Sequence, residues 1–111
     1  MAGNQYESSF RALADQTRRE ILKLLRDGPR TSGDIAEHFS SSWPTISRHL
    51  ALLREADLVL AQRKGQEIYY ELNTSVFQDL VQHLLEWVTP ATPPRKAARS
   101  SRTRIAKRRE A

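Results

Sequence analysis

A polar stretch near the middle of the chain carries side chains that are able to read DNA. Residues 42–49, SWPTISRH, combine hydroxyl, aromatic and basic groups with one apolar isoleucine. Serine and threonine hydroxyls can donate to phosphates or base edges, and an arginine can bridge O6 and N7 of guanine. The candidate DNA-binding residues of this stretch are Ser42, Trp43, Thr45, Ser47, Arg48 and His49.

Each of the larger candidates has a second interpretation. Trp43 either contacts a thymine methyl or the sugar backbone, or packs on Phe39 and the neighbouring turn. His49 either contacts a phosphate or packs beside the apolar side chains as a hydrogen-bonded histidine. For Arg48 the alternative is a solvated basic surface without a ligand.

A second basic segment, Arg63-Lys64, lies C-terminal to this polar stretch. Residues 58–72 contain two β-rich runs around Arg63-Lys64-Gly65-Gln66, which predicts a hairpin with its turn at Gly65. A hairpin with a basic tip beside a DNA-reading helix forms a wing, whose cations reach phosphates or the minor groove. The candidate wing residues are Arg63, Lys64 and Gln66.

The first polar stretch must be positioned by a helix. Ile46, Leu50 and Leu53 recur at i, i+4 and i+7, which predicts an amphipathic helix with the polar candidates off its apolar stripe. Ser42 is a suitable N-cap, and a proline is tolerated in the first helical turn. The free N–H groups at such a helix start also suit phosphate.

A shorter helix is expected just before it. Thr31 and Asp34 resemble a capping box, which predicts a helix over residues 32–38. Residues 39–42 then join two helices by a short polar turn. This order of elements is typical of the DNA-binding helix-turn-helix, in which the second helix places its N-terminal end in the major groove.

The two ends of the folded region predict helices that form a dimer interface. Residues 6–13 have the spacing of a helix, Asp15 or Thr17 can cap a second one, and Gly28-Pro29 ends it. Residues 74–88 predict a last helix whose apolar face is wider than one small domain can cover, so the first and last helices are expected to form a homodimer. The expected dimer residues are Tyr6, Phe10, Leu13, Phe77, Leu80, Val81, Leu84 and Leu85.

Composition excludes several classes of protein. The 111 residues include no cysteine, which rules out disulfide frameworks and thiolate sites. The three histidines lack a plausible serine or carboxylate partner for a triad, and no glycine-rich phosphate loop is present, so we expect no enzyme. No apolar run is long enough to span a membrane and the N-terminus does not resemble a secretory signal, so a cytoplasmic protein without membrane contacts is expected.

The net charge of +5 is unevenly distributed. Residues 95–111 contain eight Lys or Arg and one Glu, whereas residues 1–94 carry a net charge of −2. Three prolines between residues 90 and 94 block a continuing helix. We therefore expect a folded DNA-binding and dimerisation domain over residues 1–88 and a basic, disordered tail over residues 89–111.

Taken together, four segments resemble the ArsR family of winged helix-turn-helix repressors: LADQTRREILKLL, SGDIAEHF, PTISRHLALLREADLV and RKGQEIYY. The resemblance covers roughly residues 5–88. Within the family, the sequence most resembles the subgroup of repressors that has no metal site. It implies an α+β, mostly helical homodimer, in which residues 45, 47 and 48 read DNA and residues 63–66 form the wing. Gln16 and Trp43 depart from the family pattern, which usually has proline and a small or amide residue there.

The same resemblance raises the question whether the protein senses a metal ion, as some members of the family do. The cysteine pair of arsenic and cadmium sensors is absent, because the chain has no cysteine. Zinc and nickel sensors of the family combine an Asp-x-His pair with a downstream His-x-x-His or His-x-x-Glu pair; here only the second pair has a counterpart, His83-x-x-Glu86. We expect no metal cofactor, and Asp79, His83 and Glu86 are the residues that a zinc site would need.

The sequence thus predicts a dimeric repressor that binds a palindromic duplex operator of its own or a neighbouring operon. Its release is expected to depend on a small molecule, a partner protein or protein concentration. Three alternatives stay open: a zinc-responsive repressor, a nucleic-acid-packing protein that binds through its tail, and a protein-interaction module that ignores DNA.

Overall fold

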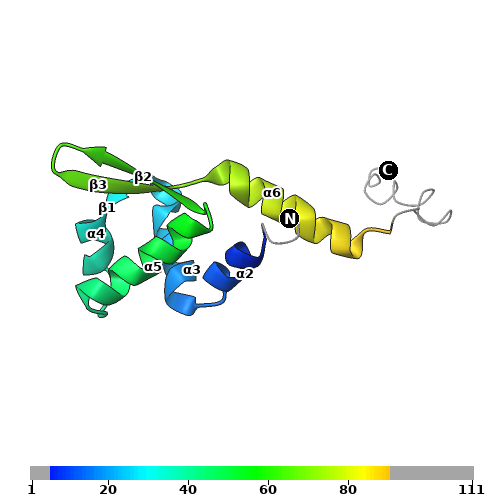
Figure 1. Ribbon diagram of the computed structural model, residues 1–111, viewed down its shortest axis with the longest axis horizontal. Helices are drawn as coiled ribbons and strands as arrows, with labels where there is room; N and C mark the ends of the chain where they lie inside the picture. The colour runs from blue at the N-terminus through cyan, green and yellow to red at the C-terminus, as the bar shows by residue number, and fades with distance from the viewer. Residues whose placement is uncertain (1–5, 91–111) are drawn as a thin grey trace, which may run out of the picture. The chain divides into compact units, whose positions relative to one another are not determined.

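The computed structural model describes residues 6–90 of the chain (Figure 1). Its elements are α2 (Glu7–Leu13), α3 (Gln16–Leu24), the 3-10 turn η1 (Leu25–Asp27), β1 (Arg30–Thr31), α4 (Ser32–Glu37), α5 (Trp43–Glu55), β2 (Val59–Lys64), β3 (Glu67–Leu72) and α6 (Thr74–Val88). The chain divides into two compact units, one that runs to Leu80 and one that begins at Val81. From residue 91 onwards, the predicted basic tail lies outside the described residues.

Three helices begin at the side chains that the sequence indicates. The N-cap residues of α3, α4 and α5 are Asp15, Thr31 and Ser42. Each side-chain oxygen accepts the backbone N–H of the residue three positions later, at 3.1, 3.1 and 3.4 Å respectively. These bonds satisfy N–H groups that have no partner within the helix. The predicted caps are therefore confirmed, and the start of α5 is fixed locally.

The core of the first unit surrounds one face of α5. Ile46, Leu50 and Leu53 are at most 1% exposed, as their spacing predicts. Helix α5 contacts α2, α3 and α4 on this side, and β2 also packs against it. The core is completed by the buried side chains Ala12, Ile21, Leu22, Leu25, Ile35, Ala56, Leu58, Val59 and Tyr70. Because α5 is surrounded on its apolar side, its opposite face is left for solvent or a ligand.

The hairpin forms where it is predicted. β2 pairs antiparallel with β3, and Lys64 faces Glu67 across the two-residue turn Gly65-Gln66. Gly65 has a φ of 65°, at the first central position, where a type II′ hairpin turn requires a residue without a side chain. The structure adds a strand that the sequence did not indicate, because β1 pairs with β3 and places Arg30 opposite Tyr70.

The C-terminal end of α5 is closed by a Schellman motif. The N–H of Leu58 donates to the carbonyl of Leu53 at 3.0 Å, and the N–H of Asp57 donates to that of Arg54 at 2.9 Å. Asp57 occupies the left-handed position of the motif, with a φ of 60°, where glycine is usual. Leu53 and Leu58 are both fully buried, which supplies the apolar contact of the motif.

No helix described within residues 6–90 has the length and apolarity that crossing a bilayer requires.

The unusual conformation of Asp57 leads to a stability prediction. The Asp57→Gly variant should gain about 0.5–1 kcal/mol in free energy of unfolding, because it removes a Cβ from the left-handed region at some cost in chain entropy. Chemical denaturation measures the gain. Asp57→Ala is the matched control, since it removes the same carboxylate but keeps the Cβ. Equal stability of the glycine and alanine variants would contradict the interpretation.

Candidate nucleic-acid interface

Helices α4 and α5 are joined by a short, hydrogen-bonded turn. The N–H of His38 donates to the carbonyl of Ile35 at 3.1 Å, and the N–H of Phe39 donates to that of Ala36 at 3.2 Å. Ile35 and Ile46 are fully buried and hold the two helices against the same core. The predicted helix-turn-helix is confirmed, with α5 in the position of its second helix.

The N-terminal half of α5 exposes a polar surface. Ser47 and Arg48 are exposed, whereas Thr45 and His49 are half-buried. Within residues 6–90, the guanidinium of Arg48 has no hydrogen-bond or ion-pair partner. It can therefore bind a guanine edge or a phosphate without first breaking a contact inside the protein.

Two hydroxyl groups of this surface contact each other. The Ser42 and Thr45 side-chain oxygens lie 3.0 Å apart, and Ser42 also accepts the backbone N–H of Thr45. The cap thus holds both hydroxyls at the start of α5. Each retains hydrogen-bonding capacity, because a hydroxyl has one donor and two acceptor positions.

Trp43 is the first residue of α5 and is 52% exposed. Its indole also approaches α4, since a Cβ built on Gly33 would lie 4.0 Å from its Cζ2 atom. One edge of the ring therefore lies beside Gly33 of the preceding helix, and the remaining surface faces solvent at the N-terminal end of α5.

His49 is held from outside its helix by Arg18 of α3. The Arg18 guanidinium lies 3.2 Å from His49 Nδ1. Because arginine has no acceptor, this nitrogen must accept the bond, which leaves the proton of the neutral ring on Nε2. The contact places His49 beside the core and leaves Nε2 as a donor. His49 is thus both a packed residue and a candidate phosphate contact.

The same arginine ties α3 to the end of α2. Arg18 Nε donates to the carbonyl of Ala12 at 2.7 Å, and its terminal nitrogen donates to that of Arg11 at 3.0 Å. These carbonyls belong to the last turn of α2, where that of Arg11 also accepts the backbone N–H of the C-cap residue Ala14 at 3.2 Å. The pKa of Asp15 is lowered, chiefly because its carboxylate accepts the backbone N–H of Arg18. Sequence reasoning missed this role of Arg18.

The wing candidates lie at the tip of the hairpin. Arg63, Lys64 and Gln66 are all exposed. Lys64 Nζ lies 5.5 Å from the centre of the Tyr69 ring, which holds the ammonium along the hairpin. The hairpin tip and the N-terminal end of α5 both lie toward the left of Figure 1, at the same end of the first unit.

The expected dimer residues differ in exposure. Tyr6, Phe10, Leu13 and Phe77 are half-buried, and Leu80 is only 2% exposed. In the second unit, Val81, Leu84 and Leu85 are 52%, 36% and 49% exposed, with Trp87 and Val88 more exposed still. Their place in a dimer interface stays a prediction. The exposed apolar side chains are those that a second copy would cover.

The residues described by the structure form no group of three or more His, Cys, Asp or Glu side chains that could hold a metal ion. His83 instead makes an edge-to-face contact with Trp87, at 5.6 Å between ring centres.

Comparison with known proteins identifies the family to which this architecture belongs. The profile of the family described as bacterial regulatory protein, arsR family, matches residues 15–60, which include α3, α4 and α5. The chain is also 52% identical over 79 residues to the transcriptional repressor SdpR of Bacillus subtilis, covering 71% of this chain and 88% of that protein. The chain belongs to the ArsR family. It is similar as well to the arsenical resistance operon repressor of Staphylococcus aureus, with 34% identity covering 76% of this chain and 81% of that repressor.

Solved structures of ArsR-type regulators share the fold. A homodimeric winged helix-turn-helix DNA-binding domain from Mycobacterium bovis has 32% identity and a TM-score of 0.64, covering 75% of this chain and 80% of that domain. An ArsR-like transcriptional regulator from Rhodococcus has 26% identity and a TM-score of 0.71, covering 99% of this chain and 97% of that regulator. This ArsR-family chain is therefore a winged helix-turn-helix protein, and β2 and β3 form its wing.

The contacts of Arg18 lead to a stability prediction. Arg18→Lys should lower the free energy of unfolding by about 1–3 kcal/mol, because one ammonium cannot serve two carbonyls and an imidazole with the geometry of a guanidinium. Arg19→Lys is the control, since Arg19 makes a single exposed bond, to Leu13. Urea denaturation of the two variants measures the difference. Equal losses would show that Arg18 does not link the helices.

Proposed function

We propose that this protein is a cytoplasmic, homodimeric repressor that binds a palindromic DNA operator through α5 and the wing. The observation that carries the proposal is the exposed Arg48, which has no partner within residues 6–90 and lies on a helix whose opposite face is fixed in the core. The family relationship supports the same function, since relatives of this chain are named as repressors.

The proposed dimer forms through α2 and α6. The exposed Val81, Leu84 and Leu85 supply apolar surface whose burial favours association. The related domain from Mycobacterium bovis is homodimeric, which supports the same state here. A twofold dimer would place its two α5 helices about 34 Å apart, so that each enters the major groove of one half-site.

We assign contrasting roles to the DNA-facing residues. Thr45, Ser47 and Arg48 read base edges, whereas Ser42, Trp43 and His49 contact the sugar-phosphate backbone. The wing residues Arg63, Lys64 and Gln66 add contacts to phosphates or the minor groove. The eight basic residues of the segment 95–111 add sequence-independent attraction to DNA. A small molecule or a protein acts as the inducer.

Selection of binding sequences from a random duplex pool tests the proposal. The full chain and a version that ends at Val88 should both enrich one palindromic motif, because sequence reading belongs to α5. A motif from neither protein would contradict a specific repressor. Enrichment by neither, together with tight binding of any duplex by the full chain only, would support the tail-driven alternative.

Arg48 should contribute specificity as well as affinity. Arg48→Ala should weaken binding to the selected operator by about 1–3 kcal/mol and relax discrimination at one base pair. Arg54→Ala is a matched control, because Arg54 is an exposed arginine in the last turn of the same helix. Fluorescence anisotropy with operator and random duplexes gives both affinities. An equal loss on both duplexes would make Arg48 a phosphate contact.

The wing should act on all sequences alike. The double variant Arg63→Ala/Lys64→Ala should weaken operator and random duplexes by the same factor. It should also reduce the slope of log affinity against log salt by about 2, one counterion for each lost phosphate contact. Anisotropy titrations at several salt concentrations measure the slope. An unchanged slope would remove the wing from the interface.

A further inference from the structure

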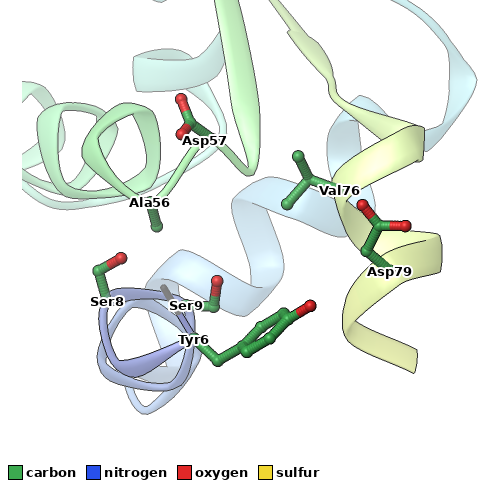
Figure 2. Close-up of a pocket in the computed structure, with 7 residues that line it drawn as sticks. All are labelled: Tyr6, Ser8, Ser9, Ala56, Asp57, Val76 and Asp79. Atoms are coloured by element: carbon green, nitrogen blue, oxygen red, sulfur yellow. The ribbon is translucent and has the colours of Figure 1, made fainter. Parts of the chain in front are cut away.

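A cavity lies at the C-terminal end of α5, on the side away from the hairpin tip. It encloses about 200 Å³ within the first unit. Its walls come from the start of α2, the turn after α5 and the first turns of α6 (Figure 2). The lining residues are Tyr6, Ser8, Ser9, Ala56, Asp57, Val76 and Asp79.

Asp57 and Asp79 line this cavity, and nothing in the described chain neutralises their carboxylates. Asp57 and Asp79 are exposed, and among residues 6–90 neither has an ion-pair partner. Figure 2 shows the two carboxylates on different walls, one beside α5 and one on α6. Like charges around one cavity create a negative potential, which attracts a cation.

Ser9 supplies an independent observation. It is only 2% exposed, and within the described residues no hydrogen bond of its hydroxyl is formed. Figure 2 shows the hydroxyl pointing from α2 into the space between Ala56 and Val76. A buried hydroxyl without a partner is uncommon, because it loses its bonds to water and gains none. A ligand atom that bonds to Ser9 would restore the missing interaction.

We propose that this cavity binds a compact organic ammonium ion. The N–H groups would donate to the two carboxylates and to Ser9, while a short alkyl part would lie against Ala56 and Val76. A metal ion suits the cavity less well, since among the described lining residues two carboxylates are the only anionic groups and none is a histidine. Two acidic side chains also disfavour an anion.

The position of the cavity suggests a regulatory consequence, which rests on the proposed repressor function. Asp57 lies in the turn that closes the C-terminal end of α5, the proposed DNA-reading helix. Ser9 and Asp79 belong to α2 and α6, the helices of the proposed dimer. An ammonium ion held between them draws the end of α5 toward α6 and changes the angle at which α5 meets DNA. Occupancy of the cavity therefore lowers operator affinity.

Binding is tested first without DNA, by titrating butylammonium chloride into the ¹⁵N-labelled full chain. Saturable amide shifts are expected at Ser9, Asp57 and Asp79, with a Kd of about 1–10 mM for so small a ligand. Butanol and sodium butyrate, matched in length, should produce no saturable shift at these residues. Absence of saturation, or equal binding of butanol, overturns the proposal.

Charge variants locate the site. Asp57→Asn and Asp79→Asn should each weaken butylammonium binding about two- to fivefold, as expected for one exposed ion pair. Asparagine is the appropriate replacement at Asp57, because it also tolerates the left-handed conformation. Asp27→Asn, which removes an equal charge away from the cavity, should have no effect. Equal effects of all three variants would mean general charge attraction only and would overturn the site.

Ser9→Ala separates a binding role from a structural one. Removing a hydroxyl that has no partner among the described residues should raise Tm in the absence of ligand and weaken butylammonium binding. A lower Tm with unchanged binding would show that the hydroxyl serves the fold, and would overturn its role in the site.

The regulatory step is tested by operator binding in butylammonium chloride against the same concentration of sodium chloride. Weaker operator binding in butylammonium, lost in Asp79→Asn, supports the link. Saturable amine binding with unchanged operator affinity overturns the link but leaves the site. A chain that binds amine and no duplex contradicts the proposed function alone.

Discussion

The rotational setting of α5 is the constraint on which the rest of the structure depends. Ile46, Leu50 and Leu53 are almost completely buried, so the helix cannot turn about its axis without exposing them to water. A straight helix with one buried face must direct the opposite face outward. Ser47 and Arg48 lie on that outward face, and their availability to DNA follows from the burial of three other side chains.

Polar contacts at the middle and at the C-terminal end of α5 refine this setting. Midway along the helix, Arg18 bridges His49 and the carbonyls that end α2, so α5 is coupled to a helix of the proposed dimer. At its end, the left-handed Asp57 turns the chain sharply into β2 and places a carboxylate over a cavity. The same helix thus meets the proposed dimer elements at its middle and at its C-terminal end. A change in those elements has a direct physical route to the exposed side chains of α5.

Features encoded within a few residues could be predicted from the sequence, and features that depend on distant pairs could not. The caps at Asp15, Thr31 and Ser42 and the turn at Gly65 are local, because each involves groups at most three residues apart. The Arg18–His49 bond joins residues 31 positions apart, and β1 adds only two residues to the sheet. Neither leaves a periodic pattern. The exposed face of α5, which carries the candidate DNA-binding residues, could be predicted because periodicity identifies the buried stripe and, by exclusion, the face opposite it.

The most direct measurement of the central claim is a ¹⁵N–¹H chemical-shift map of the labelled protein, titrated with the palindromic duplex that selection recovers. We predict that the largest shifts fall in residues 42–49 and 62–66, with smaller ones in α6. We also predict that a scrambled duplex removes the shifts of Ser47 and Arg48 and retains those of the wing. Shifts confined to α6 or to residues 95–111, or identical for both duplexes, would contradict the role assigned to α5.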